Sequence, residues 1–253
     1  MISICIPTMD RPQKLFEAVC SILLQGEDNL ELVLKDNGTI PCTEDPRVEK
    51  VLELFPGRVD YRRDEPLSLF RSANDCLARA RGDLFYFMGD DDMLSPGALR
   101  AVRERFEVER FREPFWLHGL TVSADDSGKA LGIDGSLTSY GQMLEHNRIG
   151  GPSVFWSRGI AAISGNFDTR YRYAADYDLW LRMWRIREPA FLDQPLGIYR
   201  HHPGQTSVSR RDELEREARA ISSRHRYLAD AIGAARAVQM SRKAYGGDFP
   251  PER

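Results

Sequence analysis

Residues 83–94 read DLFYFMGDDDML, in which three consecutive aspartates follow a run of large apolar side chains. A short apolar run that is rich in aromatic residues favours a buried β-strand. Closely packed like charges repel one another, and a buried carboxylate is costly unless another group compensates its charge. The stretch therefore predicts a core strand that ends in an acidic turn, and two interpretations of Asp90, Asp91 and Asp92 stay open.

The first interpretation of the acidic turn is purely structural. The next segment, SPGALRAVRERFE at 95–107, has the pattern of a helix start, with Ser95 as N-cap and Pro96 as the first helical residue. The aspartates would then lie in a solvated strand-to-helix turn. The second interpretation is an oxygen-ligand site for a hard divalent cation such as Mg²⁺ or Mn²⁺.

Strands and helices alternate in the sequence before the acidic turn. Strand-like runs occupy 2–7, 30–35, 59–63 and 83–89, and helical patterns occupy 10–26 and 68–82. This β-α-β-β-α-β order predicts an α/β fold with a mainly parallel central sheet covered by helices. After Asp92 the alternation loosens. The expected elements there include a helix at 95–110, a strand at 114–124, the segment PSVFWSRG at 152–159 followed by a short helix GIAAISG, a helix at 176–188, a strand at 190–202 and a helix at 210–245.

Composition restricts the class of protein. The chain has 253 residues and a net charge of −3, which argues against a nucleic-acid partner because dedicated nucleic-acid binders are normally basic. Its four cysteines show no CxxC or Cys/His pairing, so neither a zinc site nor a disulfide framework is expected. No signal peptide and no transmembrane segment are expected either. A cytoplasmic protein is the default expectation.

Polar residues follow several of the expected strands, where ligands of open parallel sheets bind. They lie at Pro7–Asp10, Asp36–Thr39, Arg62–Arg63 and Asp90–Asp92. This convergence favours a metal-and-ligand interpretation of the aspartates. The chain has neither GxxxxGK[ST] nor GxGxxG, so phosphate charge would be met by a metal and by arginine rather than by a glycine-rich loop.

Five segments, in the right order, resemble the motifs of the family-2 glycosyltransferases of the GT-A fold. They are ISICIPTMDR, LELVLKDNGT, RSANDCLARARGDLFYFMGDDDML, GGPSVFWSRGIAAISGNFDTRYRYAADYDLWLRM and YRHHPGQTS. The resemblance implies a Rossmann-like, nucleotide-diphospho-sugar transferase domain over residues 1–208. Within it, 1–92 would form the nucleotide-binding half and 93–208 the acceptor half, followed by a helical tail at 209–253.

The resemblance also implies an activity. Such enzymes move a sugar, with inversion, from a UDP-, dTDP- or GDP-linked donor to a hydroxyl of a glycan, a lipid-linked acceptor or a small molecule. The implied cofactor is Mn²⁺ or Mg²⁺, whose Lewis acidity would stabilise charge on the leaving diphosphate. The implied setting is the synthesis of bacterial-type surface glycans or glycoconjugates.

The D-x-D motif of the family places the metal ligand at Asp91. Asp92 is a further candidate metal ligand or a contact for the sugar, and His202, which follows Arg200 at the end of an expected strand, is a candidate third metal ligand or diphosphate contact. Asp90 would approach the donor ribose or the metal. Gly89 departs from the pattern because it stands where the first aspartate of D-x-D-D is usual, so the division of roles among the aspartates stays open.

The candidate donor contacts lie at the ends of the first two strands. Pro7, Thr8 and Asp10 would line the nucleoside, and Asp36 would accept a hydrogen bond from the nucleobase. Each aspartate has an alternative role. Asp36 could cap an Asx-turn, and Asp10 could be the N-cap of the first helix.

Two arginines are further candidate donor contacts. Arg71 lies where the family places a cation near the base or diphosphate, and its alternative is an exposed helix residue. Arg200 would be the charge partner of His202, whereas strand alternation would direct His201 to the opposite face. Segment 203–209 is a candidate loop that closes over the donor.

Asp176 matches the catalytic base of the family, which takes the proton of the acceptor hydroxyl. An ordinary aspartate pKa of about 3.9 would keep it ionised. Its alternative is an N-cap role, and Ala175 replaces the usual acidic neighbour. Trp156 and Tyr173 are candidates for stacking on a sugar ring.

The helix expected at 210–245 has two interpretations. It could dock on its own domain, which its mixed acidic residues favour, or it could form a homodimer contact or a peripheral contact with an anionic membrane. Two rival functions remain. A nucleotidyltransferase would open with a glycine-rich loop, which PTMDRP lacks. A catalytically silent module that binds a nucleotide sugar or a glycan stays open because of Gly89 and Ala175.

Overall fold

The computed structural model describes residues 1–109 and 113–245, except for the side chains of Thr206 and 233–245. Its described strands form one nine-stranded sheet in the order β3-β2-β1-β4-β8-β6-β9-β5, with β7 paired to β6. The strands are β1 (Ile2–Thr8), β2 (Leu30–Asp36), β3 (Arg58–Arg63), β4 (Leu84–Phe87), β5 (Met93–Leu94), β6 (Trp116–Ala124), β7 (Ala130–Asp134), β8 (Val154–Ser157) and β9 (Ala190–Arg200).

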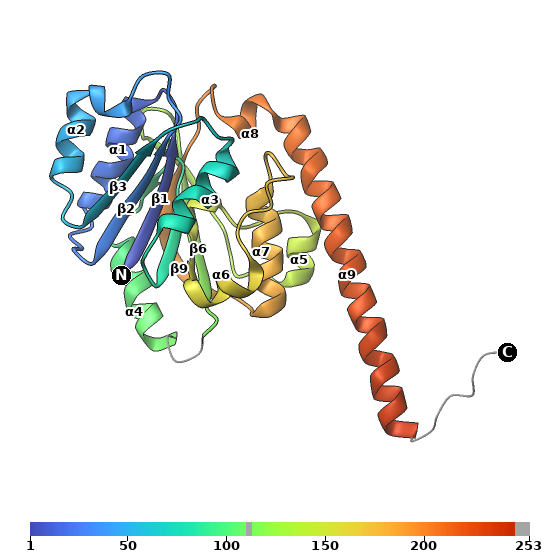
Figure 1. Ribbon diagram of the computed structural model, residues 1–253. Coiled ribbons are helices and arrows are strands. Elements are labelled where there is room, and N and C mark those ends of the chain that lie inside the picture. Colours follow the sequence, from blue (N-terminus) through green and yellow to red (C-terminus); the bar gives the residue numbers. More distant parts are fainter. Residues whose placement is uncertain (110–112, 246–253) are drawn as a thin grey trace.

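Helices cover both faces of this sheet (Figure 1). They are α1 (Pro12–Leu23), α2 (Pro46–Glu53), α3 (Leu69–Arg79), α4 (Ala98–Glu109), α5 (Tyr140–Glu145), α6 (Arg158–Ser164), α7 (Ala175–Ile186), α8 (Thr206–Ser209) and α9 (Arg211–Tyr245), with short 3₁₀ turns η1 (Cys42–Glu44) and η3 (Gly151–Ser153). Apolar side chains of α1, α2 and α4 pack on one face. Those of α3, α5, α6, α7 and α9 pack on the other. The α/β architecture expected from the sequence is confirmed.

Strand alternation in β1 shows how the two apolar clusters form. Ile2, Ile4 and Ile6 belong to the cluster beneath α1, α2 and α4, whereas Cys5 belongs to the cluster on the other face. Successive side chains of a strand point to opposite faces, so a nearly continuous apolar run serves a strand that is covered on both sides. Strands β3, β2, β1 and β4 are parallel, which brings their carboxyl ends to one edge of the sheet.

The segment after the aspartates differs from the expectation. Residues Met93–Leu94 form β5, which pairs antiparallel with β9, and helix α4 begins only at Ala98. The prediction that Ser95 is the N-cap and Pro96 the first helical residue was wrong. The backbone amide of Ser95 donates instead to the Leu196 carbonyl on β9. Pairing with β9 thus keeps Ser95 beside the sheet, although its local sequence favours a helix start.

This pairing determines where the acidic turn lies. The aspartates sit between β4, which pairs with β1, and β5, which pairs with the end of β9. The residues that follow β9 are therefore brought beside the turn, although more than a hundred positions separate them in the sequence. The structure also contains α2, α5 and the β7 hairpin strand, which the sequence patterns did not predict.

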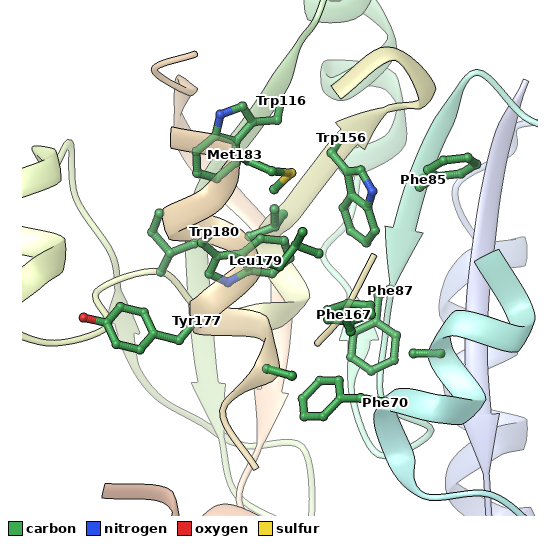
Figure 2. Close-up of a cluster of buried hydrophobic side chains, with 14 of the residues drawn as sticks. Phe70, Phe85, Phe87, Trp116, Trp156, Phe167, Tyr177, Leu179, Trp180 and Met183 are labelled. Atoms are coloured by element: carbon green, nitrogen blue, oxygen red, sulfur yellow. The ribbon is translucent and has the colours of Figure 1, made fainter. Parts of the chain in front are cut away.

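An aromatic cluster fills the space between the sheet and α7 (Figure 2). The Trp156 ring packs edge-on against Trp180, with ring centroids 5.7 Å apart, and also contacts Phe167. Trp156 is only 1% exposed. The expectation that it stacks on a sugar was wrong, because the ring is part of the core.

Helix α9 contacts the domain through its first turns and then extends beyond it (Figure 1). Ile221 is fully buried, and the His225 ring contacts Asp178 of α7, with 3.0 Å between Nε2 and Oδ1. The docked interpretation therefore holds for this part of the helix. Residues 246–253 of the expected tail lie outside the described residues. Across the described helices, none is long and apolar enough to cross a membrane.

Candidate functional site

A cleft of about 350 Å³ opens where the carboxyl ends of β1 and β4 meet the end of β9 and the start of α7. Several predicted residues line it: Pro7, Thr8, Asp90, Asp91, Asp92, Tyr173 and Asp176. A larger hollow of about 640 Å³ lies at the opposite, amino-terminal ends of β1 and β4. We take the smaller cleft as the site because it gathers the charged groups at the ligand-binding edge of the sheet.

Asp90 is fully buried and borders the cleft. Its Oδ2 accepts a hydrogen bond from Thr8 Oγ1 at 2.7 Å, and its Oδ1 lies 2.6 Å from Nη2 of Arg11. Burial raises the pKa of Asp90 to about 6, although the Arg11 charge opposes the shift. Thr8 thus contacts the acidic turn and lines the same cleft.

Asp91 lies between two cationic or titratable groups. Its Oδ2 is 2.6 Å from Nη1 of Arg11 and 2.9 Å from Nε2 of His202. Burial acts to raise the Asp91 pKa, but the Arg11 charge and the His202 hydrogen bond hold it below its usual value. The structure therefore brings together Asp91 and His202, two of the three candidate metal ligands.

Asp92 is buried beside Asp91, and its Oδ1 accepts a hydrogen bond from the backbone amide of Arg200 at 3.3 Å. Burial and the Asp91 charge raise its pKa well above the ordinary value. Gly89 borders both carboxylates. A Cβ at this position would lie 2.5 Å from Oδ1 of Asp91 and 3.3 Å from Oδ2 of Asp92. The departure from D-x-D-D therefore leaves room for the two aspartates that follow.

Arg200 supports the acidic turn from behind. Its guanidinium donates from Nε to the Asp91 carbonyl at 2.8 Å and forms an ion pair with Glu17 of α1. The side chain is buried and is not part of the cleft lining. His201 points to the opposite side, as strand alternation predicts, where its Nε2 lies 3.4 Å from the Ser123 hydroxyl.

The donor set suits a hard divalent cation. Within the described residues, no three or more Asp, Glu, His or Cys side chains are grouped so that they could hold a metal ion by themselves. Asp91, Asp92 and His202 could nevertheless supply an open set of oxygen and nitrogen ligands. Mg²⁺ typically binds through one or two carboxylates, water and substrate phosphates, so an open set fits it. Without such a cation, Arg11 is the group that neutralises Asp90 and Asp91.

Asp36 has the turn-capping role that was one of its two alternatives. Its carboxylate accepts hydrogen bonds from the backbone amides of Gly38 and Cys42 and from the Tyr61 hydroxyl, each at 2.8 Å. Burial acts to raise its pKa, yet these donors hold it below the usual value. Contact with a nucleobase stays a prediction. The neighbouring Asn37 lines the cleft.

Two other predicted donor contacts lie away from the cleft lining. Asp10 has a left-handed backbone with φ of 53° and accepts a hydrogen bond from the Thr39 amide at 2.7 Å. Arg11, not Asp10, is the N-cap residue of α1, so the N-cap alternative was wrong. Arg71 is an exposed residue of α3 and is not among the side chains that line the cleft. Nucleotide contacts by these two residues stay predictions.

Asp176 reaches the cleft from the first turn of α7. The N-cap residue is Ala174, so the N-cap alternative for Asp176 was wrong. Burial raises the pKa of the half-buried Asp176 to about 6, and the Glu217 charge adds to this shift. The ordinary value assumed from the sequence was therefore too low. A base whose pKa lies near the working pH is well suited to accept a proton.

The sequence interpretation missed several residues of the site. Arg11 was visible in the PTMDR motif but was not singled out, although it contacts two of the aspartates. Other missed residues that line the cleft are Met9, Asn37, Leu67, Phe87, Tyr199, Gln205 and Leu214. They come from loops, from the ends of strands β4 and β9 and from α9, where no local pattern marks a residue as facing a cleft. Segment 203–209 contains α8, and Gln205 and Ser207 line the cleft, whereas closure over a donor stays a prediction.

Comparison with known proteins agrees with this geometry. Residues 3–112 match the model of Glycosyl transferase family 2. An uncharacterized glycosyltransferase of Haemophilus influenzae is 25% identical over 217 residues, which cover 83% of this chain and 71% of that protein. A PGL/p-HBAD biosynthesis glycosyltransferase of Mycobacterium bovis is 28% identical over 190 residues, which cover 72% of this chain and 69% of that protein.

Solved structures show the same fold. S. aureus TarS 1–349 in complex with UDP-GlcNAc matches with a TM-score of 0.61 and 14% identity over 81% of this chain. A longer S. aureus TarS chain matches with a TM-score of 0.61 and 15% identity over 80% of this chain. The chain spans only 59% and 37% of those two TarS chains. Over residues 3–112 the chain is thus similar to the family-2 glycosyltransferases, it is similar over most of its length to relatives named as glycosyltransferases, and it shares the fold of TarS.

Proposed function

We propose that the protein is an inverting, divalent-metal-dependent glycosyltransferase that uses Asp176 as its base. One observation carries the proposal: a single cleft contains both the acidic turn Asp90–Asp92 and the half-buried Asp176, whose pKa is about 6. In inverting transfer a cation can stabilise the charge on the leaving diphosphate, and a carboxylate can take the proton of the acceptor hydroxyl. The cleft offers a candidate group for each task.

The chain's own residues would act as follows. The oxygen of the acceptor hydroxyl attacks the anomeric carbon of the donor sugar, and the bond from that carbon to the diphosphate breaks. The Asp176 carboxylate accepts the proton that the acceptor hydroxyl loses. Asp91, Asp92 and His202 would hold Mn²⁺ or Mg²⁺, which supplies Lewis-acid stabilisation of the leaving diphosphate. Arg11 is placed to bring a further positive charge to the same region.

A UDP-linked sugar is the donor that we propose, because TarS 1–349 has been solved with UDP and with UDP-GlcNAc. Pro7, Thr8 and Asn37 line the part of the cleft at the ends of β1 and β2. For the acceptor we propose a hydroxyl of a glycan or glycoconjugate. The relative named for PGL/p-HBAD biosynthesis supports that class.

Nucleotide binding and turnover test different parts of this proposal. Thermal unfolding is measured with UDP, dTDP or GDP, each with Mn²⁺, Mg²⁺ or EDTA. A nucleotide at about 100 times its dissociation constant adds roughly 2.7 kcal/mol to the stability of the folded state. We expect stabilisation by UDP with metal that disappears in EDTA, and the absence of any nucleotide effect would contradict the proposal.

A turnover measurement distinguishes an active glycosyltransferase from the rival hypothesis of a catalytically silent binding module. UDP release from UDP-GlcNAc is followed in wild type and in Asp176→Asn, with UDP binding as the control for an intact donor site. We expect the variant to bind UDP and to release it far more slowly. A wild-type protein that binds UDP but shows the same negligible turnover as the variant would favour the silent module.

A further inference from the structure

Helix α9, which the sequence assigned to a helical tail after the transferase domain, contributes to the wall of the cleft. Leu214 lines the cleft, and Ile221 and His225 are buried against the domain. Ser222 donates to the Leu144 carbonyl of α5 at 2.5 Å. With Glu217, these residues fall at i, i+3, i+7, i+8 and i+11, so they share one face of the helix. This docked face includes one carboxylate, that of Glu217.

The Glu217 carboxylate accepts hydrogen bonds from three successive backbone amides. Oε1 accepts from Arg172 at 2.8 Å, and Oε2 accepts from Tyr173 at 2.8 Å and from Ala174 at 3.0 Å. These amides immediately precede α7, whose N-cap residue Ala174 has only a methyl side chain. A concave run of amides at a helix start is a favourable place for an anion. Here the anion comes from a different helix.

The amides that Glu217 holds are adjacent to the candidate base. Asp176 lies two residues after Ala174, and both Tyr173 and Asp176 line the cleft. The segment that Glu217 fixes therefore sets the position of the Asp176 carboxylate relative to an acceptor. Displacements of about 1 Å can cost an enzyme roughly 100-fold in rate.

We propose that Glu217 is a positioning residue, which holds the segment 172–174 and thereby aims Asp176 at the acceptor. This inference rests on the proposed function, because it takes Asp176 as the base. If Glu217 has this role, the docked part of α9 belongs to the side of the cleft where Asp176 meets the acceptor hydroxyl. Glu217 acts through the backbone amides that it holds and through its charge near Asp176, and it is not itself a catalytic residue.

The test compares Glu217→Gln and Glu217→Ala with Glu215→Gln. Gln replaces one acceptor oxygen with an NH₂ group that faces backbone donors, and Ala removes the carboxylate. Glu215 is the matched control because it lies on the same helix, where its partly exposed side chain pairs with Arg211 and Arg219. Ile221, Ser222 and His225 remain to keep α9 docked in all three variants.

The first readout is amide hydrogen exchange of segment 170–176, which needs no knowledge of the substrate. We expect exchange to be on the order of tenfold faster in both Glu217 variants, because charge-assisted hydrogen bonds to these amides are lost. Glu215→Gln should exchange like wild type. Unchanged exchange in the Glu217 variants would overturn the proposal.

The second readout is UDP release from UDP-GlcNAc with Mn²⁺. We expect kcat to fall on the order of tenfold or more in the Glu217 variants, while the KM for the donor and UDP binding stay unchanged. A kcat equal to that of Glu215→Gln would overturn the positioning role. Asp176→Asn could turn over UDP-GlcNAc as fast as wild type while amide hydrogen exchange in segment 170–176 is faster in the Glu217 variants. That result would show that Asp176 is not the base, but that Glu217 still holds the backbone of segment 172–174.

Discussion

Asp176→Asn should make the folded protein more stable at alkaline pH while it removes activity. The pKa of Asp176 is raised from 3.8 to about 6, mainly by burial. An ionised carboxylate in this place therefore destabilises the folded state, and a shift of this size corresponds to about 3 kcal/mol. Solvent reaches part of the half-buried side chain, so we expect a gain of about 1–2 kcal/mol from the neutral amide.

The pH dependence gives the sign of the effect. Below pH 3.8 the carboxyl group is neutral in both folded and unfolded states, so the substitution gains nothing there. Between 3.8 and about 6 the unfolded state loses its proton first, and the cost to the folded wild type grows. Above about 6 the full cost is present. The stability difference between variant and wild type should therefore rise from pH 4 to pH 7 and then remain level.

Thermal unfolding at pH 4, 6 and 8 measures this difference. A gain of 1 kcal/mol corresponds to roughly 2–4 °C in Tm for a chain of this size. Asp168→Asn is a control of opposite sign, because the hydrogen bond and charge of Arg170 lower the Asp168 pKa to about 2. That variant should lose stability at pH 8. Equal or lower stability of Asp176→Asn at pH 8 would refute the view that Asp176 is a destabilised, poised base.

Three further predictions follow from the same cleft. Turnover of wild type should fall as pH drops below about 6, because Asp176 becomes protonated; a rate that stays level between pH 5 and 8 would exclude this group as the base. Arg11→Gln should lower the stability of the folded state by about 1–3 kcal/mol in EDTA, because it removes the guanidinium that pairs with the buried Asp90 and Asp91. Mn²⁺ should restore part of the loss, and thermal unfolding with and without Mn²⁺ measures both effects. Gly89→Asp completes the usual D-x-D-D pattern. It should lower Tm and weaken Mn²⁺-dependent UDP binding, because its Cβ alone would lie 2.5 Å from Asp91 Oδ1. Tighter UDP binding by this variant would show that the neighbouring aspartates move aside freely.

The sequence by itself determined the order of the nucleotide-binding half. Apolar runs and helical stripes predicted β1, α1, β2, α3 and β4 close to their observed bounds. These signals are local, because strand and helix periodicity follow from residues a few positions apart. They also placed the aspartates at the end of a buried strand. The side chains that meet those aspartates were not accessible in this way.

Only the tertiary structure decided how the site is assembled. The helix expected at Ser95 starts three residues later because β5 pairs with β9. The contacts of Asp91 with Arg11 and His202 span 80 and 111 positions. The pKa of Asp176 depends on burial, which no neighbouring residue in the sequence reveals. Glu217 reaches the segment before α7 only because α9 docks on the domain. Residues a few positions apart determine the periodicity of strands and helices. The charge balance of the aspartates and the position of Asp176 depend instead on segments that meet only when the sheet forms and α9 packs against the domain.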